Sequence, residues 1–254
     1  MDAFELLETA LFPADLCFSF RSAVFDGCFY YFTMPHEHVI YKFTRGFSPA
    51  GYIKIQRQYS CICRDGAEQC FWASADDHSA FIYKLDREFQ EISRLPVASP
   101  LALQGGSFTQ ITGISYDCES DTLLVSFTEC IVRICKRSAV SHIIMGSCAQ
   151  SCAGVLSLPP YYAAIQQDRQ EIRFFTEKGC VPQRIKVPHE YRILDILLNP
   201  RQKHVNNVPA LMVIAAKHDG RLQILLYHLE AHMKLHHCNF SACMQQNDTE
   251  AALY

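Results

Sequence analysis

Short apolar runs alternate along this chain with polar turn residues. The runs are rich in Val, Ile, Tyr and Phe, as in residues 28–33 and 112–116, and they are shorter than typical helices. Asp-Gly pairs, such as Asp26-Gly27 and Asp219-Gly220, favour tight turns between the runs. Because no helical segments alternate regularly with the runs, the pattern argues against a Rossmann-like sheet and predicts an all-β fold.

Two segments repeat each other at an offset of 42 residues. Residues 40–47 read IYKFTRGF and residues 82–89 read IYKLDREF, with five identical positions. The same offset relates Cys28-Phe29 to Cys70-Phe71. A repeat of about 40 to 45 residues is typical of propeller blades, each made of four strands. The repeat therefore favours a β-propeller over a β-sandwich, which also has short and evenly spaced strands.

The rest of the chain follows the same order of four strands separated by turns. We predict a single β-propeller domain over residues 1–254, with about five four-stranded blades. The expected blades cover approximately residues 18–56, 57–108, 109–150, 151–190 and 191–238, and residues 239–254 form a tail.

The two ends of the chain bear on whether the ring closes at five or six blades. Residues 3–11 are the exception to the lack of helical periodicity, because Phe4, Leu7 and Leu11 recur at helical spacing. Residues 232–236 are expected to form the fourth strand of the fifth unit. Residues 16–20 could supply a strand that closes the ring, and a sixth blade would need strands from both ends.

One unit resembles the repeats of a known superfamily of propellers. Residues 111–117 (ITGISYD) and 121–126 (DTLLVS) resemble the blade start of NHL-type and YVTN-type β-propeller repeats. The shared pattern is an apolar inner strand, a turn containing Asp, and an apolar second strand that ends in a small residue. The resemblance implies a blade rather than a particular chemistry. The Gly-His and Trp-Asp signatures of WD40 blades are missing, and paired glycines like those of kelch blades occur once, at Gly105-Gly106.

Composition and charge narrow the class of protein. Hydrophobic residues make up 49% of the chain, which is enough for a packed core and excludes a disordered protein. The formal net charge is -3, whereas nucleic-acid-binding proteins usually carry a basic excess, so no nucleic-acid partner is expected. No basic start precedes an apolar leader, and the apolar segments are shorter than the roughly 20 residues of a membrane helix. We therefore expect a cytoplasmic protein without a membrane partner.

The chain is rich in cysteine, with 13 residues, an odd number that cannot all pair within one chain. A reducing cytoplasm would keep these cysteines as thiols. Cys28 and Cys70 each precede an aromatic run, so we expect both to be small buried hydrophobic residues.

Loops that join the second strand to the third share one face of a propeller with the loops between blades. Function usually resides in loops held by a rigid scaffold. Each of the five loops carries at least one carboxylate, and three of them also carry histidine. We call this set of side chains the rim. The candidate ligand-binding residues of the rim are His36, Glu37, His38, Asp76, Asp77, His78, Glu129, Asp168, Arg169, His218 and Asp219.

The composition of the rim has two interpretations. Imidazole and carboxylate together suit Zn²⁺ or Mn²⁺, and carboxylates alone suit Ca²⁺ or Mg²⁺, so the rim has the donors for a divalent cation. Asp is also common in turns because it bonds its own backbone, and this interpretation needs no ligand. His36 and His38 are the candidate metal ligands, but Pro35 places them in a turn and no third ligand is identifiable. We therefore predict no cofactor.

The leading hypothesis is a binding or interaction propeller without catalytic activity, which presents the rim to a protein or a small-molecule ligand. The sequence has no Gly-rich phosphate loop and no G-x-S-x-G nucleophile elbow. One alternative is a metal-assisted hydrolase or lactonase. Its candidate residues are Asp195, Asn199 and Asp117, of which only Asp195 lies early in its strand. Another alternative is a five-bladed glycosidase, which would need two carboxylates about 5 to 10 Å apart in an axial pocket.

Overall fold

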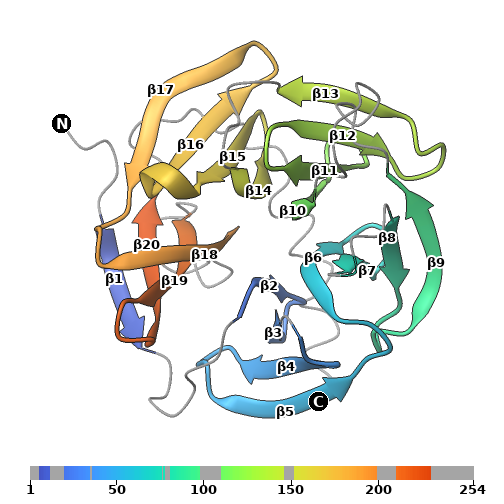
Figure 1. Cartoon of the computed structure of the whole chain (residues 1–254), viewed down its shortest axis with the longest axis horizontal. Helices are drawn as coiled ribbons and strands as arrows, with labels where there is room; N and C mark the ends of the chain where they lie inside the picture. The colour runs from blue at the N-terminus through green and yellow to red at the C-terminus, as the bar shows by residue number, and fades with distance from the viewer. Residues whose placement is uncertain are drawn as a thin grey trace.

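The computed structural model describes residues 6–11, 20–34, 36–75, 77, 81–97, 110–145, 152–198 and 210–229. These residues form five four-stranded antiparallel sheets around a central axis (Figure 1). The chain is therefore a five-bladed β-propeller, and the predicted fold class is confirmed. Among the residues given above, no helix is both long and apolar enough to cross a membrane.

Each blade runs from an inner strand at the axis to an outer strand. The first blade consists of β2 (Ser22–Phe25), β3 (Phe29–Thr33), β4 (Val39–Thr44) and β5 (Pro49–Lys54). The second consists of β6 (Tyr59–Asp65), β7 (Cys70–Ala75), β8 (Phe81–Leu85) and β9 (Glu91–Pro96). The third consists of β10 (Ile111–Asp117), β11 (Thr122–Phe127), β12 (Ile131–Cys135) and β13 (Ser141–Met145). The fourth consists of β14 (Cys152–Leu158), β15 (Tyr161–Gln166), the 3-10 helix η3 (Gln167–Arg169), β16 (Glu171–Thr176) and β17 (Gly179–Lys186). The fifth consists of β18 (Tyr191–Leu198), β19 (Ala210–Lys217), β20 (Leu222–His228) and β1 (Leu6–Leu11).

The fifth blade takes its outer strand from the start of the described chain. β1 pairs antiparallel with β20, so the order of the sheet is β18-β19-β20-β1. The helix indicated for residues 3–11 is therefore wrong for Leu6–Leu11, because the edge of β20 offers these residues a ladder of backbone hydrogen bonds. The place beside β20 predicted for residues 232–236 belongs to β1. Residues 232–236, 16–19 and 239–254 themselves lie outside the described residues.

Apolar side chains between the blades form the core. Five clusters of buried residues lie one at each interface between neighbouring blades. Trp72 and Leu123 belong to the cluster between the second and third blades, and Phe32 and Ile214 to the cluster between the first and fifth. Because every blade packs against two neighbours, the core is a closed ring and the inner strands surround the axis.

The sequence repeat reflects one turn conformation that the first two blades share. Phe47 and Phe89 are buried and have left-handed backbones, with φ of 62° and 61°. Phe47 stacks on Tyr30 with ring centroids 4.6 Å apart, and Phe89 stacks on Phe71 at 4.4 Å. The repeated phenylalanine therefore fixes the turn between the third and fourth strands against the second strand.

The second strands of these blades repeat at an offset of 41 residues, one fewer than the third strands. Tyr30 pairs with Phe43 and Phe71 pairs with Leu85, so Tyr30 corresponds to Phe71. Cys28 therefore corresponds to a turn residue rather than to Cys70. It is exposed, and the prediction that it is buried is wrong, whereas Cys70 is buried as predicted. All nine cysteines within the described ranges are free thiols.

Candidate functional site

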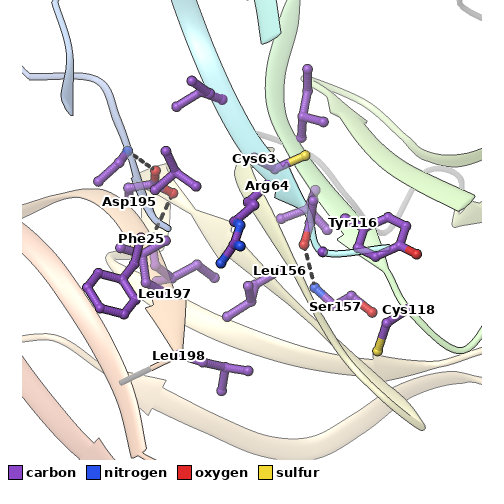
Figure 2. A pocket seen from close by; sticks show the side chains of 18 of the residues that line it. Phe25, Cys63, Arg64, Tyr116, Cys118, Leu156, Ser157, Asp195, Leu197 and Leu198 are labelled. Carbon is purple, nitrogen blue, oxygen red and sulfur yellow. Dashed lines mark hydrogen bonds between the residues drawn. The ribbon is translucent and has the colours of Figure 1, made fainter. Parts of the chain in front are cut away.

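A cavity of about 220 Å³ lies on the axis inside the ring of inner strands (Figure 2). All five inner strands, β2, β6, β10, β14 and β18, contribute to its wall. The wall extends to the turns that follow these strands, at Gly27, Gly66, Cys118 and Pro159. An inner strand starts at the rim face and ends at its first turn. The cavity therefore lies toward the end of the axis opposite the rim.

The pairing of the strands arranges the inner residues in levels along the axis. The first pairs after the β-bulges are Cys61 with Ser74, Gly113 with Ser126, Gly154 with Ile165, and Asp195 with Ile214. Ser22, which pairs with Thr33, occupies the equivalent place in the first blade. We call these five inner residues the Asp195 level. Three residues further along each strand lies the Arg64 level, and all its members line the cavity: Phe25, Arg64, Tyr116, Ser157 and Leu198.

Asp195 joins the fifth blade to the first at the inner end of the cavity. Its Oδ2 accepts hydrogen bonds from Ser22 Oγ at 2.8 Å and from the Ala23 amide at 2.7 Å, and its Oδ1 accepts one from the Ile196 amide at 2.8 Å. Ser22 repeats this contact one blade further, because its hydroxyl accepts the Ile62 amide at 3.2 Å. Asp195 therefore links the fifth blade to the first, and Ser22 links the first blade to the second.

The ionisation of Asp195 should affect stability. Burial raises the pKa of Asp195 to about 6, although the hydrogen bonds from Ala23, Ser22 and Ile196 act in the opposite direction. An unfolded chain has an Asp pKa near 3.9, so the folded protein holds this proton at a higher pH than the unfolded chain does. The stabilisation that comes from protonating Asp195 is therefore complete below about pH 3.9, decreases above that pH, and is lost as the pH rises through 6.

Replacing Asp195 by Asn removes this pH dependence. We expect the stability of Asp195→Asn relative to the wild type to be about 1 kcal/mol more favourable at pH 7.5 than at pH 5. Urea unfolding of both proteins at the two pH values measures this difference. Asp219→Asn, on the exposed turn between β19 and β20, is the control and should keep a constant difference. A constant difference for Asp195→Asn as well would contradict the assignment.

Of the other two residues considered for an axial metal site, Asp117 does not join Asp195 in the cavity wall. Asp117 is buried, but it caps its own turn: Oδ1 accepts the Glu119 amide at 3.2 Å and Oδ2 accepts the Ser120 hydroxyl at 2.7 Å. Asn199 lies outside the described residues. The structure therefore brings only Asp195 of this set to the described wall of the cavity.

The first-blade rim residues lie in the turn between β3 and β4. His36 is exposed and has a left-handed backbone, with φ of 69°. Glu37 accepts a hydrogen bond from the Tyr41 hydroxyl at 3.0 Å. His38 is exposed, and its Nδ1 lies 3.2 Å from the carbonyl oxygen of Gln56. Glu37 and His38 thus contact the first blade and the loop that follows it.

The remaining rim residues are distributed over the other four blades. Asp77 Oδ2 lies 3.6 Å from Arg57 Nη1, and Asp219 Oδ1 accepts a hydrogen bond from the Arg221 amide at 3.0 Å. The others that the structure describes are Glu129 in an exposed turn, Asp168 and Arg169 in η3, and His218 in the turn after β19. Asp76 and His78 lie outside the described residues.

Within the described ranges, the rim brings no three metal-ligand side chains together; the one such group is Asp65, Glu68 and Cys70, near the first turn of the second blade. Lys136 reaches this group from the third blade, with its Nζ 2.6 Å from Asp65 Oδ2 and 3.1 Å from Glu68 Oε1. The lysine ammonium therefore supplies the positive charge at this place, and the group is an ion pair between blades.

Comparisons with known proteins agree on the fold. The sequence matches no family model and no curated protein. Glutaminyl cyclase of Myxococcus xanthus is 9% identical with a TM-score of 0.62, over 89% of this chain and 97% of that one. Virginiamycin B lyase of Staphylococcus aureus is 11% identical with a TM-score of 0.52, over 89% and 99%. Hydrazine synthase of Kuenenia stuttgartiensis is 15% identical with a TM-score of 0.49, and this chain covers 58% of it. At these identities, the first two likenesses show a shared propeller fold.

Proposed function

We propose that this β-propeller is a binding protein without catalytic activity, and that its axial cavity takes a small-molecule ligand. The observation that carries the proposal is the axial cavity of about 220 Å³, whose wall all five inner strands build from apolar side chains and a few polar ones.

The wall has the composition of a ligand site. Binding pockets are mostly apolar and contain a few polar groups that orient the ligand. Val24, Leu156 and Leu197 are among the apolar residues of this wall, and Arg64, Ser157 and Asp195 are among its polar ones. Arg64 and Asp195 come from different blades, the second and the fifth, and both line the same cavity.

The catalytic alternatives have less support. A glycosidase needs two carboxylates at the reaction centre, and Asp195 is the one carboxylate among the described lining residues. A catalytic metal needs about three protein ligands, and within the described residues Asp195, Cys63 and Cys118 of this wall do not come together as such a group.

Ligand or partner binding at the rim, as a second binding surface, stays a prediction. A protein partner there, the cytoplasmic location, and the absence of a cofactor, a nucleic-acid partner and a membrane partner also stay predictions. The exposed carboxylates and histidines of the rim suit a solvated surface as well as a partner.

Filling the cavity tests the proposed function. Leu156→Trp places an indole in the wall between the Asp195 level and the Arg64 level. A ligand that binds the folded protein raises its Tm in proportion to ln(1 + [L]/Kd). Among phenylalkyl acids, alcohols and amines, we expect at least one compound to raise the Tm of the wild type but not that of Leu156→Trp.

The control places the same indole elsewhere. Ile92 is 58% exposed on the outer strand β9, so Ile92→Trp should respond like the wild type. Leu197→Phe, at the same level as Leu156, fills less of the cavity and should weaken ligand binding. It is the substitute variant if Leu156→Trp is too unstable. Equal ligand responses in all four proteins would contradict a cavity site.

A further inference from the structure

We infer that the axial cavity takes a small monoamine with an apolar body, and that the ligand ammonium lies against Asp195 at the inner end of the cavity. This inference rests on the proposed function and adds the chemical class of the ligand. It depends on three features of the described residues: a carboxylate that lines the cavity, neutral hydrogen-bond donors as its partners, and an apolar wall around it.

Asp195 presents its carboxylate to the cavity. It lines the wall and is only partly buried (Figure 2). Its Oδ2 accepts two hydrogen bonds, from the Ser22 hydroxyl and the Ala23 amide, whereas Oδ1 accepts one, from the Ile196 amide. Each oxygen of a carboxylate can accept about two hydrogen bonds, so Oδ1 can take one further donor.

The neighbouring inner residue of the fourth blade has no side chain to cover this oxygen. Gly154 occupies the Asp195 level on β14, and a Cβ at this glycine would lie 3.9 Å from Asp195 Oδ1. The level contains one long acidic side chain and four small residues, which are Ser22, Cys61, Gly113 and Gly154. Of these five residues, Asp195 is the one that lines the cavity.

The charge of Asp195 has no partner of opposite sign among the described residues. Its hydrogen-bond donors are one hydroxyl and two amides, which are all neutral. Arg64 is the cation of the described wall, but it lies three residues further along its strand, about 10 Å away in depth. Burial raises the pKa of Asp195 and the three neutral donors lower it, with no contribution from Arg64. A ligand ammonium would therefore supply the missing positive charge.

The wall next to Asp195 is apolar, which strengthens the attraction for an ammonium. One residue beyond the Asp195 level, all five inner strands line the cavity with apolar side chains, which are Ala23, Ile62, Ile114, Val155 and Ile196. Opposite charges attract each other more strongly in such surroundings than in water. The apolar part of the ligand then lies further along the axis, against Leu156 and Leu197.

The size of the cavity and its single described carboxylate limit the ligand. An apolar cavity of about 150 Å³ holds benzene in another protein, so about 220 Å³ suits a ligand of about nine or ten non-hydrogen atoms. A phenyl ring joined to one ammonium by a short alkyl chain has this size. 2-Phenylethylamine is therefore the probe, 2-phenylethanol is its matched neutral analogue, and 3-phenylpropionate is the anionic one.

Calorimetric titration of the three compounds at pH 7.5 tests the inference. We expect the wild type to bind the amine at least about tenfold more tightly than the alcohol, as charge-assisted hydrogen bonds provide, and to bind the acid more weakly than either. Asp195→Asn keeps the shape of the side chain, and it should bring the amine and the alcohol within about threefold of each other without weakening the alcohol. Asp219→Asn, on the exposed turn between β19 and β20, is the matched control and should behave like the wild type.

Lowering the pH removes the same charge without a substitution. The pKa of Asp195 is about 6, so most of this carboxyl is protonated at pH 5 in the free protein. The preference of the wild type for the amine should therefore fall about three- to tenfold from pH 7.5 to pH 5, at an unchanged affinity for the alcohol. The nearby Cys61 stays a neutral thiol over this range because burial raises its pKa, and Arg21 and Arg64 stay charged.

The outcomes separate this inference from the proposed function. If the alcohol or the acid binds as tightly as the amine and Leu156→Trp abolishes that binding, the cavity is a ligand site but not for amines. If the amine keeps its full preference in folded Asp195→Asn, the assigned role of Asp195 is wrong, and the pH comparison on the wild type decides this point where the variant does not fold. If Leu156→Trp and the wild type respond alike to every probe, the proposed function and the inference both fail.

Discussion

Replacing Lys136 by Met is expected to lower the free energy of unfolding by about 3 to 5 kcal/mol, as breaking a buried ion pair does. The Lys136 side chain is 3% exposed, and its Nζ lies 2.6 Å from Asp65 Oδ2, 3.1 Å from Glu68 Oε1 and in contact with Asp121. Burial alone would lower the pKa of Lys136, but hydrogen bonds to Asp121, Asp65 and Glu68 outweigh burial and raise it. The ammonium is therefore charged and joins the second blade to the third.

The cost comes mainly from the partner left behind. Asp65 is fully buried; without Lys136, its Oδ2 keeps the indole N–H of Trp72 at 3.2 Å, and its Oδ1 keeps the amides of Ala67 and Glu68 at 3.0 Å. Neutral donors compensate a buried carboxylate less than an ammonium does. The double variant Asp65→Asn with Lys136→Met should therefore lose less stability than Lys136→Met alone.

Urea unfolding of Lys136→Met measures the effect, and Lys84→Met is the matched control. Lys84 pairs with the same Glu68 but is 22% exposed. Exposed pairs contribute less than about 1 kcal/mol, so Lys84→Met should cost far less than Lys136→Met. Similar costs for the two lysines would show that the Lys136 pair is not a buried link between blades.

The repeat was sufficient to predict the fold, because the same packing problem recurs in each blade. Phe47 and Phe89 fill the same turn in successive blades, and this constraint keeps their sequences alike. No comparable sequence pattern indicates the pairing of β1 with β20. Segments as short as Leu6–Leu11 fit a helix or a strand about equally well by spacing, and the partner of this one lies more than 200 residues away. The free edge of the fifth blade, which tertiary structure creates, decides the outcome.

The candidate site was harder to predict because its wall is built from ordinary inner strands. Asp195 could be singled out as an acidic residue early in an apolar strand, and it does line the cavity. Sequence reasoning missed Arg64 and Ser157. The available signal was a charged or polar residue within strands whose neighbours are buried, such as Arg64 after the buried Cys63. The level that Arg64 and Ser157 share depends on bulges and strand pairing, which a single sequence does not reveal.

Replacing Gly113 by Ala is expected to lower the free energy of unfolding by about 2 to 4 kcal/mol and the Tm by about 5 to 15 °C. A Cβ at Gly113 would lie 2.6 Å from the Cα of Gly154, 2.8 Å from the Val155 nitrogen and 2.8 Å from Ser126 Oγ. Two of these atoms belong to the backbone of the next inner strand, so no side chain can rotate to relieve the contact. β10 and β14 would have to separate.

Gly113 belongs to the Asp195 level, where neighbouring inner strands contact each other. At the equivalent places, Asp195 and Ser22 reach across to the amide of the following blade, and the third blade instead brings its backbone directly against the fourth. Gly154→Ala should cost less than Gly113→Ala, because its Cβ would meet mainly the terminal side-chain carbon of Ile165 at 2.9 Å rather than backbone atoms. Gly46→Ala, with its nearest atom at 3.8 Å, should change stability by less than about 0.5 kcal/mol. Thermal and urea unfolding of the three variants should therefore rank their costs as Gly113, then Gly154, then Gly46. Equal costs at Gly113 and Gly46 would mean that the inner strands can separate freely, and the fixed levels of the cavity wall would lose their structural basis.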